Sequence, residues 1–107
     1  MKPRFLICIP IYNNELTAGQ VIAKCLALTT LPIVVVDDGS ELPIENLVKN
    51  KNTSTERITF LRHDKNEGKG QALRTGFHFA LKNNFTHVVT IDADGLHDPS
   101  EIVKLIL

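Results

Sequence analysis

An uninterrupted apolar stretch, IVVV at residues 33–36, is the feature that most limits what this sequence can fold into. Because apolar and polar residues do not alternate in it, both faces of the strand that it predicts must be covered. Strands of this kind are typical of parallel sheets that carry helices on both sides. Three further apolar runs predict strands at residues 5–12, 58–63 and 85–91.

Helical patterns lie between the predicted strands. Thr17 and Gln20 form a capping-box pair ahead of apolar residues that are spaced to lie on one helical face. A shorter helix is predicted at residues 43–50. A third helix contains Gly76, whose lack of a side chain would allow close packing against the sheet. The alternation of strands and helices predicts a layered α/β domain with a mostly parallel sheet.

The last residues of the chain predict a fourth helix. Asp98 would cap it, Pro99 suits its first position, and Glu101 lies three residues after the cap. Apolar residues between positions 102 and 107 would form an exposed surface on that helix. Such a surface predicts self-association of the chain.

Composition and charge argue against several classes of protein. A chain of 107 residues predicts one domain, and its twelve basic and twelve acidic residues cancel. A net charge of zero argues against nucleic acid as a partner and against binding to an anionic membrane. No apolar run approaches the roughly 18 residues that span a bilayer, and we find no signal-peptide pattern. Cys8 and Cys25 are expected to be buried free thiols of a cytoplasmic protein, with membrane association left to other parts of a full-length protein.

Polar or small residues follow all four predicted strands. They are Tyr12 and Asn13, residues 37–40, residues 63–70, and residues 92–94. The carboxyl ends of parallel strands meet at one edge of a sheet, where open sheets bind their ligands. The sequence therefore predicts a ligand site built from these four loops.

Asp92 and Asp94 stand one residue apart after the fourth predicted strand. In an extended chain both carboxylates point the same way, and a cation would relieve their repulsion. Mg²⁺ favours such oxygen ligands and often shares its site with the phosphates of a substrate. A solvated turn with local capping is the alternative. His97, in the same loop, is either a ligand, an acid–base group or a solvated side chain.

Two other loops are candidates for contact with a nucleotide. Asp37 and Asp38 follow the second strand, where an acid can accept a hydrogen bond from a base or a ribose, and Gly39 permits a tight turn. Lys69 and Arg74 lie near the start of the third helix, where amide groups and the helix dipole favour an anion. Turn chemistry alone would explain the first loop, and solvated side chains the second. The glycines of the second loop do not complete a dinucleotide-binding fingerprint.

Four segments, PIYNNE, VVVDDGS, NEGKGQALRTGF and DADGLHDP, occur in this order between residues 10 and 99. Together they resemble the N-terminal half of inverting family-two glycosyltransferases with the GT-A fold, a three-layer α/β sandwich. Within that family the likeness is greatest to the polyprenyl-phosphate and dolichyl-phosphate sugar transferases. The resemblance covers almost the whole chain.

The resemblance implies a nucleotide-diphosphate sugar as donor and a lipid phosphate or a glycan as acceptor. It places Asp38 on the base, with Pro10 and Tyr12 lining the base pocket, and it assigns Mg²⁺ or Mn²⁺ to Asp92 and Asp94. The residues predicted to bind the nucleotide-sugar are Pro10, Tyr12, Glu15, Asp37, Asp38, Gly39, Lys69, Arg74 and Asp92.

Two positions differ from the common family motifs. Many relatives have a glutamate where this chain has Asn14, with Glu15 one position later, and many have a glutamine where it has Leu96. The resemblance also ends soon after the paired acids. Residues 1–107 are therefore expected to be a single donor-binding domain, truncated after the D-x-D motif. The acceptor site and any catalytic base would belong to the missing half, so we assign no catalytic residue here.

Two other functions are compatible with parts of the sequence. The acids that follow residues 33–36 resemble the acidic pair of response-regulator receiver domains, with Asp92 as the phosphate acceptor. A nucleotide-binding regulatory domain without catalytic activity is the other alternative.

Overall fold

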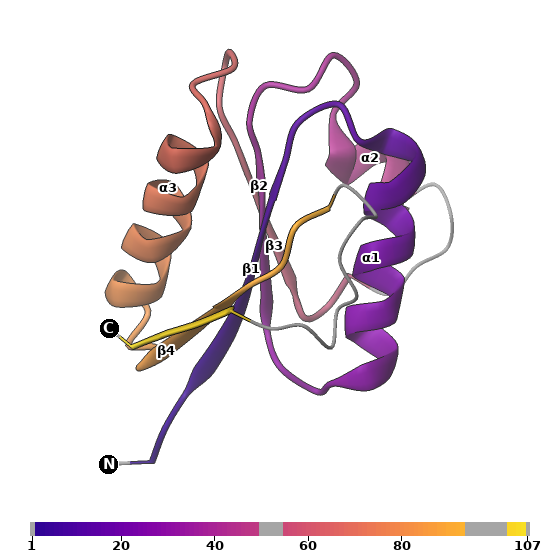
Figure 1. The fold of residues 1–107 in the computed structure, drawn as a ribbon. Helices are drawn as coiled ribbons and strands as arrows, with labels where there is room; N and C mark the ends of the chain where they lie inside the picture. Colours follow the sequence, from indigo (N-terminus) through magenta and orange to yellow (C-terminus); the bar gives the residue numbers. More distant parts are fainter. Residues whose placement is uncertain (1, 50–54, 94–102, 107) are drawn as a thin grey trace.

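The computed structural model describes residues 2–49, 55–93 and 103–106. The strands are β1 (Phe5–Ile11), β2 (Ile33–Asp37), β3 (Ile58–Arg62), β4 (His87–Thr90) and β5 (Val103–Ile106). The helices are α1 (Glu15–Leu28), α2 (Ile44–Lys49) and α3 (Lys69–Lys82). The sheet is covered by α3 on one face and by α1 and α2 on the other (Figure 1). The predicted layered α/β architecture is confirmed, and the four predicted strands lie within two residues of their expected limits.

The sheet runs in the order β3-β2-β1-β4-β5. β1 pairs in parallel with β2 and with β4, and β2 pairs in parallel with β3, so the predicted parallel sheet is confirmed for these four strands. The strand order reverses at β1, because the next strands along the chain lie on one side of it and β4 lies on the other. In open sheets such a reversal creates a crevice beyond the carboxyl ends of the strands.

The strand β5 corrects the prediction of a fourth helix. Val103–Ile106 pairs antiparallel with β4, and Val103 stands opposite Thr90. Without this pairing, the outer edge of β4 would leave a row of backbone amide and carbonyl groups unpaired. The helix signals at residues 98–101 lie outside the described residues. Self-association was expected through an apolar helix at the C-terminal end. Residues 103–106 form a strand instead, so they do not supply that helix.

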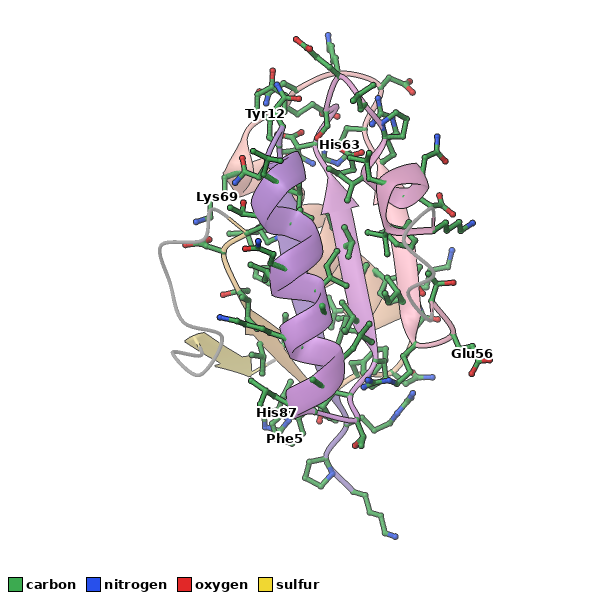
Figure 2. The ribbon with its side chains drawn as sticks, turned by 90° about the vertical axis from the view of Figure 1, so that its right-hand side faces the viewer. Phe5, Tyr12, Glu56, His63, Lys69 and His87 are labelled. Carbon is green, nitrogen blue, oxygen red and sulfur yellow. The ribbon has the colours of Figure 1, made fainter. Side chains whose placement is uncertain are left out.

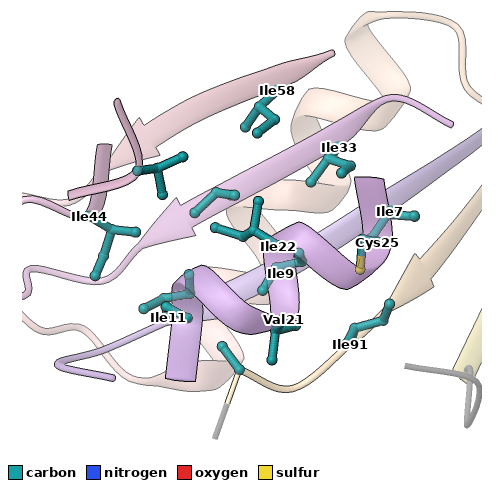
Figure 3. Close-up of a cluster of buried hydrophobic side chains, with 14 of the residues drawn as sticks. Ile7, Ile9, Ile11, Val21, Ile22, Cys25, Ile33, Ile44, Ile58 and Ile91 are labelled. Carbon is teal, nitrogen blue, oxygen red and sulfur yellow. The ribbon is translucent and has the colours of Figure 1, made fainter. Parts of the chain in front are cut away.

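Alternate residues of β1 enter two separate cores. Ile7, Ile9 and Ile11 pack with the buried faces of α1 and α2, as Figure 3 shows. Leu6 and Cys8 pack on the other side of the sheet with α3. Because both faces of the central strands are buried, these strands are apolar throughout, as the uninterrupted run predicted.

Gly76 of α3 packs against Cys8 in the second core. A Cβ atom at position 76 would collide with Cys8 Sγ, so the predicted reason for this glycine, close packing against the sheet, is confirmed. Both cysteines are free and buried, as expected. Burial raises the pKa of Cys8 to about 12 and that of Cys25 to about 11. These thiols are therefore protonated packing groups at neutral pH.

The helix α1 begins at Glu15, two residues before the predicted capping pair. Thr17 lies inside the helix, and its hydroxyl donates a hydrogen bond to the carbonyl oxygen of Ala93 at 2.7 Å. The capping prediction is therefore wrong, because this hydroxyl makes a tertiary contact. Its effect is to join α1 to the loop that follows β4.

Candidate functional site

A pocket of about 270 Å³ opens at the carboxyl ends of the parallel strands. Pro10 and Tyr12 line it from β1 and the residues just after it. Asp38 lines it from the loop after β2, Lys69 from the start of α3, and Asp92 from the loop after β4. Figure 2 shows Tyr12 and Lys69 toward the same end of the molecule. The structure therefore brings residues of all four sequence motifs to one pocket, at the reversal point of the strand order.

Asp37 supports the fold at this end of the sheet. It is buried, and its Oδ1 accepts a hydrogen bond from the amide of Ser40 at 2.9 Å. Its Oδ2 accepts from the amide of Ile44 at 3.0 Å and from the guanidinium of Arg62 at 2.6 Å. Burial alone would raise the pKa of Asp37, but the hydrogen bonds from Ile44, Ser40 and Arg62 outweigh burial and lower it. Asp37 is not among the pocket-lining residues, so its contact with a nucleotide stays a prediction.

Asp38 anchors the loop that leads into α3. The amide of Glu67 donates to its Oδ1 and the amide of Gly68 to its Oδ2, each at 2.8 Å. Gly39 has a φ of +77°, which fits the tight turn expected there. A Cβ atom on Gly39 would lie 2.5 to 2.9 Å from the backbone of residues 65–66, so only glycine fits between these two loops.

His63 begins the loop at residues 63–70 that was predicted to help build the site, but its contacts were not predicted. We assigned it no function, because it has no partner at metal-ligand spacing in the sequence. Its Nδ1 lies 2.8 Å from Asp38 Oδ1, and its Nε2 lies 2.8 Å from Thr75 Oγ1. His63 follows β3, which is the neighbour of β2 in the sheet. The signal available in the sequence was therefore its position at the carboxyl end of a strand.

Lys69 and Asp92 form an ion pair in the wall of the pocket. The Lys69 side chain is 60% exposed and the Asp92 side chain 29% exposed, so both can reach a ligand there. Asp94 lies outside the described residues, and within the described part of the chain no three acidic, histidine or cysteine side chains cluster as metal ligands. Asp92 is therefore the described half of the predicted metal pair.

The other candidate residues have different outcomes. Asn14 and Asn66 line the pocket. Asn66 lies in the predicted site loop at residues 63–70, whereas Asn14 was not assigned to the site. Arg74 is exposed on α3 and is not among the lining residues, and the side chain of Glu15 is not described. The roles of Arg74 and Glu15 stay predictions, and His97 lies outside the described residues.

The family model for glycosyl transferase family 2 matches residues 6–107 of the chain. Polyprenol monophosphomannose synthase of Mycolicibacterium smegmatis is 32% identical over 108 residues, covering 96% of this chain and 40% of that protein. UDP-N-acetylglucosamine–dolichyl-phosphate N-acetylglucosaminyltransferase of Methanococcus voltae is 30% identical over 112 residues, covering 94% of this chain and 45% of that protein. The chain thus spans about two fifths of the length of the curated relatives it matches.

Solved structures agree with the predicted fold. A mannosyltransferase from Pyrobaculum calidifontis, solved in complex with GDP-mannose and Mn²⁺, aligns with a TM-score of 0.72 at 24% identity, covering 88% of this chain and 28% of that one. The GT-A fold is therefore confirmed. Receiver domains have the strand order 2-1-3-4-5, which differs from the order found here. Because the family model covers nearly the whole sequence, the chain belongs to glycosyl transferase family 2.

Proposed function

We propose that this chain is the donor-binding domain of an inverting glycosyltransferase and that it binds a nucleotide-diphosphate sugar. The observation that carries this proposal is the convergence of residues from four separate motifs on one pocket. Membership of the family supports it. The whole chain would be a single domain, the N-terminal half of a catalytic domain whose acceptor site and catalytic base lie elsewhere in the full protein.

The two sides of the pocket differ in chemistry. Pro10 and Tyr12 supply an apolar and aromatic wall, and the Tyr12 side chain is exposed enough to stack on a base. Asp38, whose amide donates to the carbonyl oxygen of Ile11 just before Tyr12, is the acceptor proposed for the base. Lys69 and Asp92 form a charged side that suits a diphosphate and a cation. We therefore orient the donor with its base near Tyr12 and its diphosphate near Lys69.

The cation would be Mg²⁺ or Mn²⁺, held by Asp92 and Asp94 as the D-x-D pair. Asp92 fits this role, because its carboxylate is partly exposed in the pocket wall and already faces the positive charge of Lys69. One or two carboxylates together with phosphate oxygens are usual ligands of such cations. When bound, the cation would neutralise charge on the departing nucleoside diphosphate.

The relatives support the type of donor and of acceptor. The name of the Methanococcus enzyme specifies UDP-N-acetylglucosamine and dolichyl phosphate, and the Pyrobaculum structure contains GDP-mannose. We propose a sugar nucleotide and a lipid phosphate for the full protein of this chain as well. The two relatives differ in the base of the nucleotide, so they leave the base open.

The donor site is proposed to face the cytoplasm. The buried free thiols of Cys8 and Cys25 suit a reducing compartment. Within the described residues, no helix has the length and apolar character needed to cross a membrane. Contact with a membrane-bound acceptor is proposed to come from other parts of the full protein.

Calorimetric titration tests the proposed function. The 107-residue chain is titrated with UDP-sugars and GDP-sugars, with and without Mn²⁺, beside the variants Asp92→Asn and Asp64→Asn. We expect Mn²⁺-dependent binding that weakens about tenfold or more in Asp92→Asn, because a metal ligand loses its charge. Asp64 is exposed and does not line the pocket, so Asp64→Asn should bind like the native chain. Absence of binding to any nucleotide, or native-like binding by Asp92→Asn, would contradict the proposal.

A further inference from the structure

Asp38 uses most of its hydrogen-bonding capacity within the chain. A carboxylate has about four lone-pair positions, two on each oxygen. Its Oδ1 lies 2.8 Å from His63 Nδ1 and also accepts from the amide of Glu67 at 2.8 Å. Its Oδ2 accepts from the amide of Gly68 at 2.8 Å. Among the described contacts, Oδ1 is therefore fully used, and Oδ2 keeps one acceptor position.

His63 is held so that its Nδ1 stays on Asp38. A carboxylate can only accept hydrogen bonds, so the tautomer that fits this contact carries its hydrogen on Nδ1 and donates it to Asp38. The imidazole side chain is 10% exposed, and its Nε2 meets the hydroxyl of Thr75 on α3. That hydroxyl can donate to a neutral Nε2 or accept from a protonated one. The contact with Asp38 therefore persists in either charge state of the ring.

We propose that Asp38 offers a bound base a single acceptor position and that the pocket therefore prefers uracil to guanine. This inference rests on the proposed function, in which Asp38 faces the base. Uracil presents one ring N–H between two carbonyl oxygens, so one acceptor satisfies it. Guanine presents a ring N–H beside an exocyclic amine, and pairing both requires two acceptors. Asp38 could pair only one of the two guanine donors, which weakens guanine relative to a base that this carboxylate satisfies in full.

The remaining polar residues of the pocket suit the carbonyl oxygens of uracil. Asn14 and Asn66 line the same pocket, and the side-chain amide of each carries an NH₂ group that can donate, beside an oxygen that can accept. A base that is rich in acceptors around one central donor matches such a set. Tyr12 supplies a stacking surface that does not distinguish one base from another. Discrimination is therefore assigned to Asp38.

The native chain gives the first test. Dissociation constants for UDP and GDP are measured by calorimetry at the same Mn²⁺ concentration. We expect UDP to bind about tenfold more tightly, the factor that one poorly satisfied hydrogen bond produces. A preference for UDP below about threefold, or tighter binding of GDP, overturns the inference on the base and leaves the proposed function intact. If neither nucleotide binds, the proposed function is overturned, and the inference falls with it.

Variants of His63 test the origin of the preference. His63→Ala frees an acceptor position on Asp38, so the ratio of GDP to UDP dissociation constants should fall by about threefold or more. If His63 has only a structural role, its loss would weaken the binding of both nucleotides alike and leave this ratio unchanged. Thr75→Val removes the hydroxyl and keeps the Nδ1 donor, so it should retain the native ratio. His63→Asn supplies an amide donor to Asp38 and should restore the ratio lost in His63→Ala.

Circular dichroism shows whether each variant is folded. If His63→Ala is not folded, the native comparison of UDP with GDP still decides the inference on the base. A native ratio in a folded His63→Ala variant overturns the positioning role of His63.

Discussion

At the two ends of the sheet, side chains of opposite charge cap the ends of helices. At the amino end, Arg57 donates to three carbonyl oxygens in the last turn of α1 and just beyond it, at 2.8 to 3.0 Å. Arg4 donates in the same way to two carbonyl oxygens that follow α3. At the carboxyl end, Asp37 accepts from the first amide of α2, and Asp38 accepts from the amide of Gly68, just before α3. These signs match the helix dipole, which favours cations at C-termini and anions at N-termini.

The two ends differ in how much hydrogen-bonding capacity their charged side chains keep after capping the helices. The pocket at the amino end, about 390 Å³, is larger than the one of about 270 Å³ at the carboxyl end. Its two arginines direct their described hydrogen bonds to backbone carbonyl groups. At the carboxyl end, Asp38 keeps an acceptor position, and Lys69 and Asp92 are partly exposed. Volume therefore does not single out the proposed donor site, whereas unused bonding capacity does.

Asp37→Asn should have the largest effect on stability. The amide would place an NH₂ group either against the Ser40 amide or against both the Ile44 amide and Arg62, where the carboxylate now accepts hydrogen bonds. We expect a loss of about 2–4 kcal/mol in the free energy of unfolding, measured by urea denaturation. Glu45→Gln is the control, because it breaks an exposed ion pair with Lys49 and should cost under about 0.5 kcal/mol. A loss below about 1 kcal/mol for Asp37→Asn would show that this end depends little on charge.

The lowered pKa of Asp37 predicts how stability changes with pH. The folded chain holds this carboxylate ionised at a pH where the unfolded chain, with a pKa of about 3.9, already binds a proton. Its contribution is therefore present above pH 4 to 5, roughly, and is lost as the pH falls through the folded pKa. Urea midpoints measured between about pH 6 and pH 2 should fall less steeply for Asp37→Asn than for the native chain. Parallel curves would contradict this role of Asp37.

Gly39→Ala should have the next largest effect on stability. Gly39 packs against residues 65–66, in the loop that Asp38 anchors beside the pocket. Alanine would be strained at a φ of +77°, and its Cβ would meet the backbone of residues 65–66. We expect a loss of about 1–3 kcal/mol in stability and weaker nucleotide binding, because the loop anchored on Asp38 must shift. Gly70→Ala is the matched control, since its Cβ would meet open space in α3 and should stabilise the helix slightly. If Gly39→Ala leaves the nucleotide affinity unchanged, the position of this loop does not affect nucleotide binding.

The strands and the position of the pocket could be predicted from the sequence because they depend on local patterns. The run at residues 33–36 required cover on both faces, and the structure supplies it through two cores. The rule that ligands bind beyond the carboxyl ends of parallel strands then brought Tyr12, Asp38 and Asp92 to one edge. Neither step needed knowledge of a distant contact.

The features that sequence reasoning missed all depend on distant partners. Thr17 looks like a cap, but its hydroxyl bonds to Ala93, 76 residues away. The residues of β5 follow a helix-start pattern, yet they pair with the edge of β4. His63 meets Asp38 across 25 residues, and nothing close to it in the sequence indicates that contact. Local patterns therefore predicted the framework of the site, and the hydrogen bonds that tune it required the structure.

Arg57→Met should have the smallest of the three effects on stability and tests the comparison most directly. It removes the donors from three carbonyl oxygens that are partly accessible to water, so we expect a loss of about 1–2 kcal/mol in urea denaturation. Arg57→Lys keeps the charge without the planar fork and should recover only part of that loss. UDP affinity, measured with Mn²⁺, should stay within about twofold of native, because the amino end holds no part of the proposed donor site. Weaker UDP binding in a folded Arg57→Met variant would mean that the two ends are coupled, and capping by charge would then contribute to function at both.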